Sequence, residues 1–314
     1  MLRFLIARLS LIGVTLLVIS GAIFVVTEIL PGDVAQMMLK QDATEERLAS
    51  LRAELNLDRP AHVRYLSWIG GVLRGDFGES YVQKQPISDI LPRRIGHSLV
   101  LALFALVLGV PVAVAAGVWA GVRPDTLWDR VVSTVGLVGI SLPEFVTGVM
   151  LMLVLASTLH WLPPSSHIIA GTTPWSRPEI LVMPALTLMG VLFAYIMRMT
   201  RANVMEVMQT PYVRTAVLKG LPMRRVILRH VLPNAMLPTI TIIATNFGWM
   251  LGGLIIVENV FSYPGLGQLL LRSIQTRDVP LLEALSLLIA ATYAFSNLVA
   301  DLAYTALNPR IRYG

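Results

Sequence analysis

Few side chains of this chain could do chemistry in an apolar environment. There is no cysteine, so neither a disulfide nor a thiolate metal site is possible. The five histidines are scattered, and no acidic cluster accompanies the two that share a predicted loop, His160 and His167. A metal ion needs several such ligands together. We therefore expect no metal site, and nothing in the spacing marks a catalytic triad.

A nucleotide site of the phosphate-loop type is also missing from the sequence. That motif places glycine directly before lysine, as in G-x4-G-K-[ST]. The three lysines, Lys40, Lys84 and Lys219, instead follow leucine, glutamine and leucine. If ATP drives this protein, another chain must bind it.

Glu144 is the carboxyl that the sequence places deepest in a predicted membrane span, directly after Pro143. Asn246 and Asn297 are deep and neutral, and all three residues are candidates for a translocation pathway. Ionisable groups at such depth mark either a polar route or a costly structural position. Glu144 could face a route and meet a substrate ammonium, or it could be a protonated or hydrogen-bonded carboxyl at a proline kink. Both interpretations stay open. The other acids of the spans lie near their ends: Glu28, Glu258, Glu283 and Asp301.

A basic segment with a helical pattern lies between the fourth and fifth apolar runs. Val213, Ala216 and Val217 form a short apolar face that ends at Gly220, and Pro222 can open a second helix. This ordered break favours docking to a partner through Tyr212, Arg214 and Lys219. The alternative is a loop that binds anionic headgroups. The segment carries one acid, Glu206, and seven cations: Arg198, Arg201, Arg214, Lys219, Arg224, Arg225 and Arg229.

These residues must be positioned by membrane helices. The chain has 314 residues, of which 55% are hydrophobic and 14% charged, whereas soluble domains carry about 25% charged residues. A helical span needs about 20 apolar residues. Six runs qualify, at 9–29, 97–121, 131–159, 180–199, 236–257 and 281–302. The third is longer than needed and contains Pro143, so we expect it to be kinked or partly interfacial.

The short loops predict the orientation of the spans through their arginines and lysines. With the N-terminus in the cytoplasm, the inner segments hold Arg3, Arg8, Arg123, Arg130, the seven cations above, Arg310 and Arg312. The short outer loops hold Arg177, Arg272 and Arg277. The net charge of +6 is therefore explained by orientation, and no nucleic acid partner is expected.

Helical patterns also occupy the long outer loop, and small residues line the second span. Asp42 and Glu45 have the spacing of a capping box, and Pro60 can open a further helix that ends near Gly75. Such a cap either docks a partner or only covers the bundle. In the second span, small residues at every fourth position predict close helix packing: Gly109, Ala113, Gly117 and Gly121.

The basic segment resembles the EAA loop of ABC importer permeases. In that loop Glu-Ala-Ala is followed after three residues by glycine, and later by Leu-Pro. Here Arg214 and Thr215 replace the first glutamate and alanine, and His230 stands where isoleucine is usual. The resulting form is similar to the variant found in peptide and nickel permeases of the dipeptide/oligopeptide subfamily. The residues in register are Ala216, Gly220, Leu232 and Pro233.

Further segments along the whole chain resemble the same subfamily, in matching order. They are LPGD at 30–33, LNLDRP at 55–60, RGDFGES at 74–80, VENVFSYPGLGQLL at 257–270, RDVP at 277–280 and NPRIR at 308–312. Six motifs in this order are highly specific for the subfamily.

The resemblance implies the type I importer permease fold: an all-α membrane protein with six spans. It implies a structured periplasmic loop between spans one and two, and a cytoplasmic coupling helix between spans four and five. The organisation would be 1–30 for the N-terminal segment and first span, 31–96 for the periplasmic loop region, 97–308 for the permease core with its EAA-type loop at 200–235, and 309–314 for a cytoplasmic tail.

The resemblance also implies partners and site residues. The partners are a second homologous permease, two ATPase subunits or domains that bind ATP and magnesium, a periplasmic or lipid-anchored substrate-binding protein, and lipid. Coupling to the ATPase is implied for Tyr212, Arg214, Thr215, Ala216, Lys219 and Gly220. Docking of the binding protein is implied for Asp76, Glu258, Tyr263, Arg277 and Asp278.

We therefore expect a non-catalytic permease subunit of an ATP-driven bacterial uptake system for di- or oligopeptides. It would lie in the inner membrane with both termini in the cytoplasm. One alternative is an importer of nickel or another small solute. An alternative from another class is an ion-coupled secondary carrier, which would need titratable partners at mid-membrane.

Overall fold

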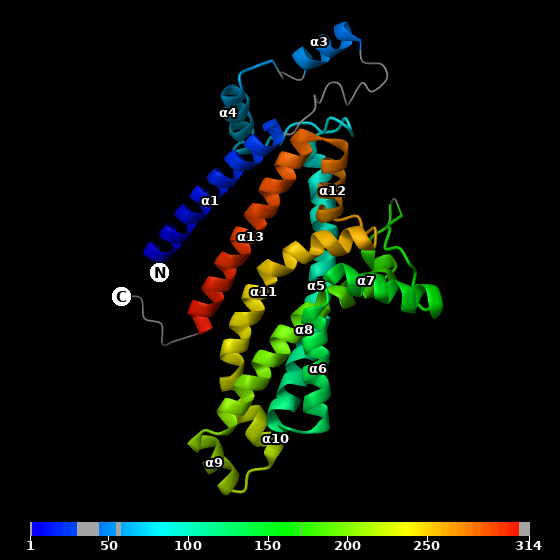
Figure 1. Ribbon diagram of the computed structural model, residues 1–314. Coiled ribbons are helices and arrows are strands. Elements are labelled where there is room, and N and C mark those ends of the chain that lie inside the picture. The colour runs from blue at the N-terminus through cyan, green and yellow to red at the C-terminus, as the bar shows by residue number, and fades with distance from the viewer. Residues whose placement is uncertain (1, 30–43, 55–57, 170, 308–314) are drawn as a thin grey trace. The chain divides into compact units, whose positions relative to one another are not determined.

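The computed structural model describes residues 2–29, 44–54, 58–169 and 171–307 (Figure 1). In these residues the structure is helical, apart from turns, loops and one isolated bridge between Glu79 and Pro86. The long helices are α1 (Leu2–Ile29), α5 (Ile87–Val122), α6 (Leu127–Ser141), α8 (Glu179–Met208), α11 (Leu232–Val260) and α13 (Val279–Leu307). The motif residues 30–33, 55–57 and 308–312, the capping-box residue Asp42 and the tail 309–314 lie outside the described residues.

Among the described residues, five helices are long and apolar enough to cross a membrane. A sixth span results if α6 and α7 (Glu144–Leu151), which continues as a π-helical segment (Met152–Thr158), are counted together. These two parts are bent by 110°. The kink predicted at Pro143 is thus confirmed. Leu142 before it has extended backbone angles, as the residue preceding a proline prefers.

Several helices extend beyond the predicted spans, α5 and α8 by the most residues. Helix α5 begins at Ile87 rather than near residue 97, and α8 continues to Met208 rather than 199. In both cases the added turns carry charges, so hydropathy alone stops short of them. The first turns of α5 are helical because Ile87, Ile90 and Leu91 bury their side chains in a local core.

The described chain forms two compact units. The first contains residues 1–97 and 265–294. Its core joins the start of α5 to α12 (Leu266–Thr276) and the start of α13 through Leu269, Leu281 and Leu285. The short helices that follow α1 along the chain are α3 (Glu45–Glu54) and α4 (Ala61–Val72), and α4 opens at Pro60 as predicted. At the start of α3, Thr44 accepts a bond of 3.4 Å from the Arg47 amide.

Helix α1 is held to this first unit by polar contacts. Ser20 and the Tyr65 hydroxyl of α4 lie 2.9 Å apart, and Glu28 forms an ion pair with Arg64. Thr27 donates a bond of 2.9 Å to the Glu283 carboxylate of α13. Many apolar side chains of α1 are exposed, and beside these three links the ring of Phe24 packs against Tyr65 and Trp68 of α4.

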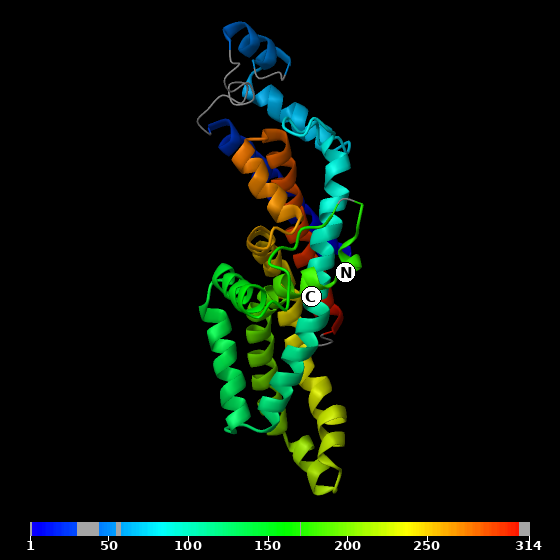
Figure 2. The same cartoon turned by 90° about the vertical axis from the view of Figure 1, so that its right-hand side faces the viewer.

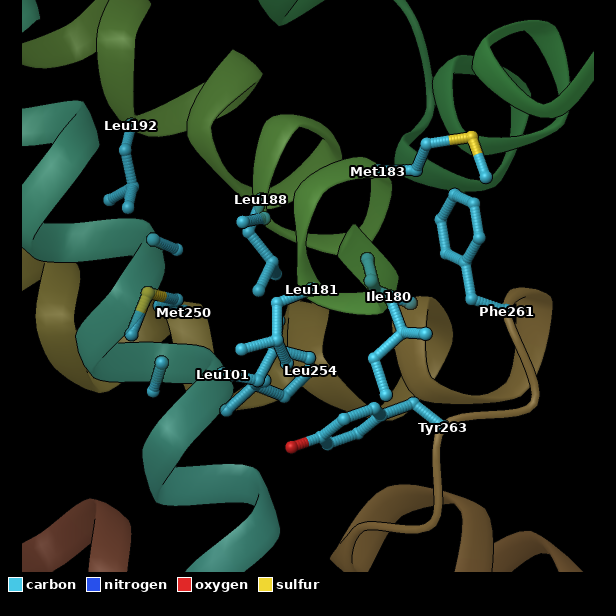
Figure 3. Close-up of a cluster of buried hydrophobic side chains, with 14 of the residues drawn as sticks. Leu101, Ile180, Leu181, Met183, Leu188, Leu192, Met250, Leu254, Phe261 and Tyr263 are labelled. Carbon is cyan, nitrogen blue, oxygen red and sulfur yellow. The ribbon is translucent and has the colours of Figure 1, made fainter. Parts of the chain in front are cut away.

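The second unit contains residues 98–264 and 295–314. Helix α8 is its centre and packs against α6, α7 and α11. Figure 3 shows side chains of three helices converging in its core, among them Leu101 of α5, Leu181 of α8 and Leu254 of α11. All three are buried, so the helices are fixed by interdigitated side chains.

The small residues of α5 allow its close approach to α8, as predicted. A Cβ atom at Gly117 would lie 2.6 Å from the Met197 carbonyl oxygen, and one at Gly121 would lie 2.8 Å from the Arg201 carbonyl oxygen. Ala113 is fully buried. Close backbone contact of this kind is how helices associate in lipid.

Candidate functional site

The segment that joins α8 to α11 folds into two short helices (Figure 1). Helix α9 (Pro211–Leu218) has proline in its first turn, where the backbone amide would have no hydrogen-bond partner within the helix. Gly220 then takes a positive φ of 75°, a conformation that only glycine adopts without strain. Helix α10 (Met223–Val226) starts after Pro222 and leads through a π-helical turn (Ile227–Val231) into α11. The predicted break at Gly220 is therefore present.

Helix α9 rests on the bases of α8 and α11. Its inward side chains, Val213 and Ala216, are buried. Val217, which the apolar pattern placed on the same face, is instead 43% exposed. The buried residues that share one cluster with Val213 and Ala216 are Val204, Val226, Val231 and Ala235. Helix α9 is therefore joined to α8 and α11 by a packed apolar base.

The outward side of α9 is basic with apolar edges. Tyr212, Arg214, Thr215 and Lys219 are exposed. Leu218 is 79% exposed. The Tyr212 hydroxyl donates to the His230 carbonyl oxygen at 3.4 Å, which ties the helix start to the following turn. Exposed apolar and aromatic side chains next to cations are typical of a protein contact surface.

Arg201 does not belong to this exposed surface. Its guanidinium binds the Asp129 carboxylate of α6 with two bonds, of 2.5 Å from Nε and 2.7 Å from the terminal nitrogen. Asp129 is buried, and it also accepts from the Asp125 amide and from Ser133. From the sequence, Arg201 was predicted to be one of the cations of the basic segment, and Asp129 was not predicted as its partner. The available signal was the N-terminal capping pattern at Thr126, whose hydroxyl accepts from the Asp129 amide.

A buried amide links α8 to α11 just above α9. Asn203 donates from its side chain to the Ala235 carbonyl and to the Thr239 hydroxyl, both at 3.3 Å. Thr200 and Thr239 lie 3.4 Å apart. The base of α8 is thus bonded to α6 on one side and to α11 on the other.

Glu144 is the first residue of α7, at the bend in the chain. Its Oε2 atom is buried and has no hydrogen-bond partner in the described chain. The carboxyl lies against α11, where a Cβ atom at Gly253 would be 2.6 Å from both oxygens. The close contact with Gly253 was not foreseen, because a glycine in an apolar run carries no distance information.

The other two pathway candidates are also half-buried. Asn246 lies in α11 and donates to the Ile242 carbonyl of its own helix at 2.8 Å. It precedes Gly253 by two turns, and therefore lies on the same face of α11. Asn297 lies in the part of α13 that belongs to the second unit. Glu144 and Asn246 thus come from neighbouring helices that pack together.

Three of the predicted docking residues belong to the first unit. Asp76 is exposed and Arg277 is half-buried. Asp278 is buried. Its carboxylate accepts hydrogen bonds from the Ser80 hydroxyl, from the Tyr81 amide at 3.0 Å and from the Val82 amide at 3.3 Å. Asp278 therefore holds the loop after Gly78 to the turn before α13.

The remaining two, Glu258 and Tyr263, are fully buried in the second unit. Glu258 accepts from the Ser98 hydroxyl at 2.5 Å. Burial, and next the Glu258 carboxylate, raise the pKa of Tyr263 above its ordinary value. Tyr263 therefore stays neutral and shapes the loop that follows α11.

Within the part of the chain that the structure describes, histidine, aspartate and glutamate nowhere gather in a group of three or more that could hold a metal ion.

Two family models match the chain. Residues 1–102 match the N-terminal part of the binding-protein-dependent transport system membrane component. Residues 113–313 match the binding-protein-dependent transport system inner membrane component. The chain belongs to this family.

Relatives of this permease align over its full length. A glutathione transport system permease protein of Salmonella choleraesuis is 37% identical over 317 aligned residues that cover 100% of both chains. The protein of the same name in Escherichia coli K12 is 37% identical over 313 residues, again covering 100% of both. A probable peptide ABC transporter permease of Sinorhizobium fredii is 37% identical over 293 residues, 93% of each chain. The predicted family is confirmed, and this permease is a multi-pass protein of the bacterial inner membrane.

Proposed function

We propose that this permease forms the translocation pathway of an ATP-driven importer for di- or oligopeptides, together with a second homologous permease. The relatives named above are glutathione transport system permeases and a probable peptide ABC transporter permease. They agree with the subfamily motifs in the sequence. The same subfamily includes nickel permeases, so import of nickel or another small solute is the second candidate. The absence of a histidine, aspartate and glutamate cluster among the described residues favours peptides.

The observation that carries the proposal is the form of α9. It is a short helix with a buried apolar base and an exposed basic outer side, bounded by a glycine in a left-handed conformation. A loop that only touches headgroups would not need this packed base. We assign Tyr212, Arg214, Thr215 and Lys219 to contact with an ATPase subunit, Ala216 to the base, and Gly220 to the turn.

ATP and magnesium would bind on two separate ATPase subunits or domains. Their closure would push α9, and the bonded bases of α6, α8 and α11 would move with it. The free energy enters as the different affinity of ATP for two states of the complex. This chain would hydrolyse nothing itself.

We assign the termini and α9 to the cytoplasm, and α3 and α4 to the outer side. A substrate-binding protein, periplasmic or lipid-anchored, would dock there. Asp76 and Arg277 could contact it directly. The buried Glu258, Tyr263 and Asp278 would act by holding the outer loops in shape, because their side chains are not accessible.

Reconstitution in liposomes tests the proposal. The complete complex, with ATP inside and the loaded binding protein outside, should accumulate a labelled peptide. Liposomes with this chain alone, or with an ATPase that cannot hydrolyse ATP, should not. Accumulation by this chain alone, driven by an ion gradient, would establish a secondary carrier instead.

A further inference from the structure

The bend before Glu144 lies within the thickness of the membrane. Helix α6 has 15 residues and spans about 22 Å at 1.5 Å per residue, while the hydrocarbon core is about 30 Å thick. The start of α6 is marked by the exposed Trp128 and by Arg130, residues that favour the membrane interface. Irregular backbone at this depth occurs where it is covered by protein or lines a polar cavity.

Helix α7 presses against α11 over one turn of its length. The Glu144 carboxyl lies on Gly253, and a Cβ at Gly148, one turn later, would be 3.2 Å from side-chain atoms of Val260 and Phe261. A Cβ atom at the neighbouring Gly252 would meet no atom within 4 Å. The contact is therefore specific to Gly253, and it places a carboxyl in an apolar seam.

Glu144 is half-buried, and it differs in its hydrogen bonding from the acids that are buried. Asp129 binds Arg201, Glu258 accepts from Ser98, and Asp278 accepts from Ser80 and two amides. The buried Oε2 of Glu144 has no bond in the described chain. Buried polar atoms of proteins almost always have a partner, so this oxygen is a candidate for a ligand that is bound only part of the time.

We propose that the Glu144 carboxylate accepts hydrogen bonds from the amino group of the peptide during translocation. Between transport cycles, the contact with Gly253 holds the Glu144 carboxyl in place. An ammonium offers three donors and a positive charge, and its bonds to a carboxylate are stronger than neutral ones. Asn246 lies two turns along the same face of α11, about 10 Å from Gly253 at 1.5 Å per residue, and would offer the next polar group along the route. The inference rests on the proposed peptide import and names the chemical group that the route recognises.

The test uses the complete transporter in proteoliposomes. The probes are the neutral tripeptide that the wild-type complex carries fastest and its N-acetylated form, both at concentrations that saturate the binding protein. Glu144→Gln should lower the maximal uptake rate of the free-amine peptide about tenfold more than that of the acetylated one, because a charge-assisted bond is lost. Equal losses for both probes, or no loss, overturn the inference.

If the wild-type complex carries only the free-amine peptide, the two probes cannot be compared, and Glu144→Asp tests the inference instead. This variant keeps the charge, and it should transport at a rate well above that of Glu144→Gln. Equal rates for the two variants overturn the inference. If the wild-type complex carries neither probe with ATP, the proposed peptide import itself fails, and that result is distinct from a failure at Glu144.

Gly253→Ala tests the seam, with Gly252→Ala as its matched control. Only the first places a Cβ against the carboxyl, so it should slow uptake of both probes several-fold while Gly252→Ala leaves uptake near the wild-type rate. A Gly253→Ala transporter as fast as the control shows that the carboxyl is not seated there and overturns that part of the proposal.

Discussion

At the scale of single residues, Gly220 sets the direction of the arm. Its φ of 75° costs a residue with a Cβ roughly 1–2 kcal/mol. We expect Gly220→Val to displace α9 and to reduce peptide uptake relative to ATP hydrolysis. Gly220→Asn is the control, since asparagine tolerates this conformation, and it should keep most of the coupling. If the valine variant imports at the wild-type ratio of peptide to ATP, the turn is not needed for coupling.

Asp129 is the residue whose loss should weaken the contact between α6 and the end of α8 that leads into α9. Asp129→Asn leaves the half-buried Arg201 without its carboxylate, at a cost of about 1–3 kcal/mol. We expect a lower thermal unfolding midpoint for the purified protein in detergent. Asp125→Asn, at an exposed position, should change little. The double variant Asp129→Arg with Arg201→Asp should recover part of the loss, and a swap as unstable as the single variant would contradict the ion pair.

At the scale of elements, the α5–α8 contact depends on the absence of side chains. Gly117→Ala puts a Cβ 2.6 Å from a backbone oxygen of Met197, and such overpacking typically costs about 1–3 kcal/mol. Gly96→Ala in the same helix meets nothing within 4 Å. We expect only the first variant to unfold at lower temperature. Equal midpoints for the two would mean that the helices lie further apart.

Helix α9 should act through its charge as well as its shape. Reversing Arg214 and Lys219 to glutamate leaves the buried base of Val213 and Ala216 intact, so the protein should insert and fold normally. We expect the ATPase to dissociate more readily and peptide uptake to fall at least tenfold. Reversal of Arg130, an exposed cation outside α9, is the control. Unchanged uptake with both charges reversed would remove these residues from the coupling surface.

At the scale of the whole molecule, the charge of the loops predicts the topology. A green fluorescent protein fused after Gly314 should fluoresce, and alkaline phosphatase fused there should be inactive, because we assign both ends to the cytoplasm. Alkaline phosphatase inserted at the exposed Thr172 should be active in the periplasm. The reverse pattern would invert the assignment of α9 and of the outer helices, and it would contradict the proposed coupling.

Much of this protein could be predicted from its sequence. Apolar runs are averages over many residues, so they located the long apolar helices. The positions of Pro143 and Gly220 predicted the kink and the break, because proline and glycine interrupt helices locally. Motifs in the right order identified the family, which the family models confirm. The start of α5 at Ile87 was missed because charged residues lower the hydropathy of turns that a local core keeps helical.

Only the tertiary structure decided which side chains meet. It paired Arg201 with Asp129, placed Asp278 under a loop distant in sequence, and set the Glu144 carboxyl against Gly253. Periodicity and composition describe each helix by itself, whereas these contacts depend on how neighbouring helices rotate and pack. For that reason the sequence alone could name Glu144 as unusual, and the packing of α7 on α11 was needed to show that one of its buried oxygens lacks a partner.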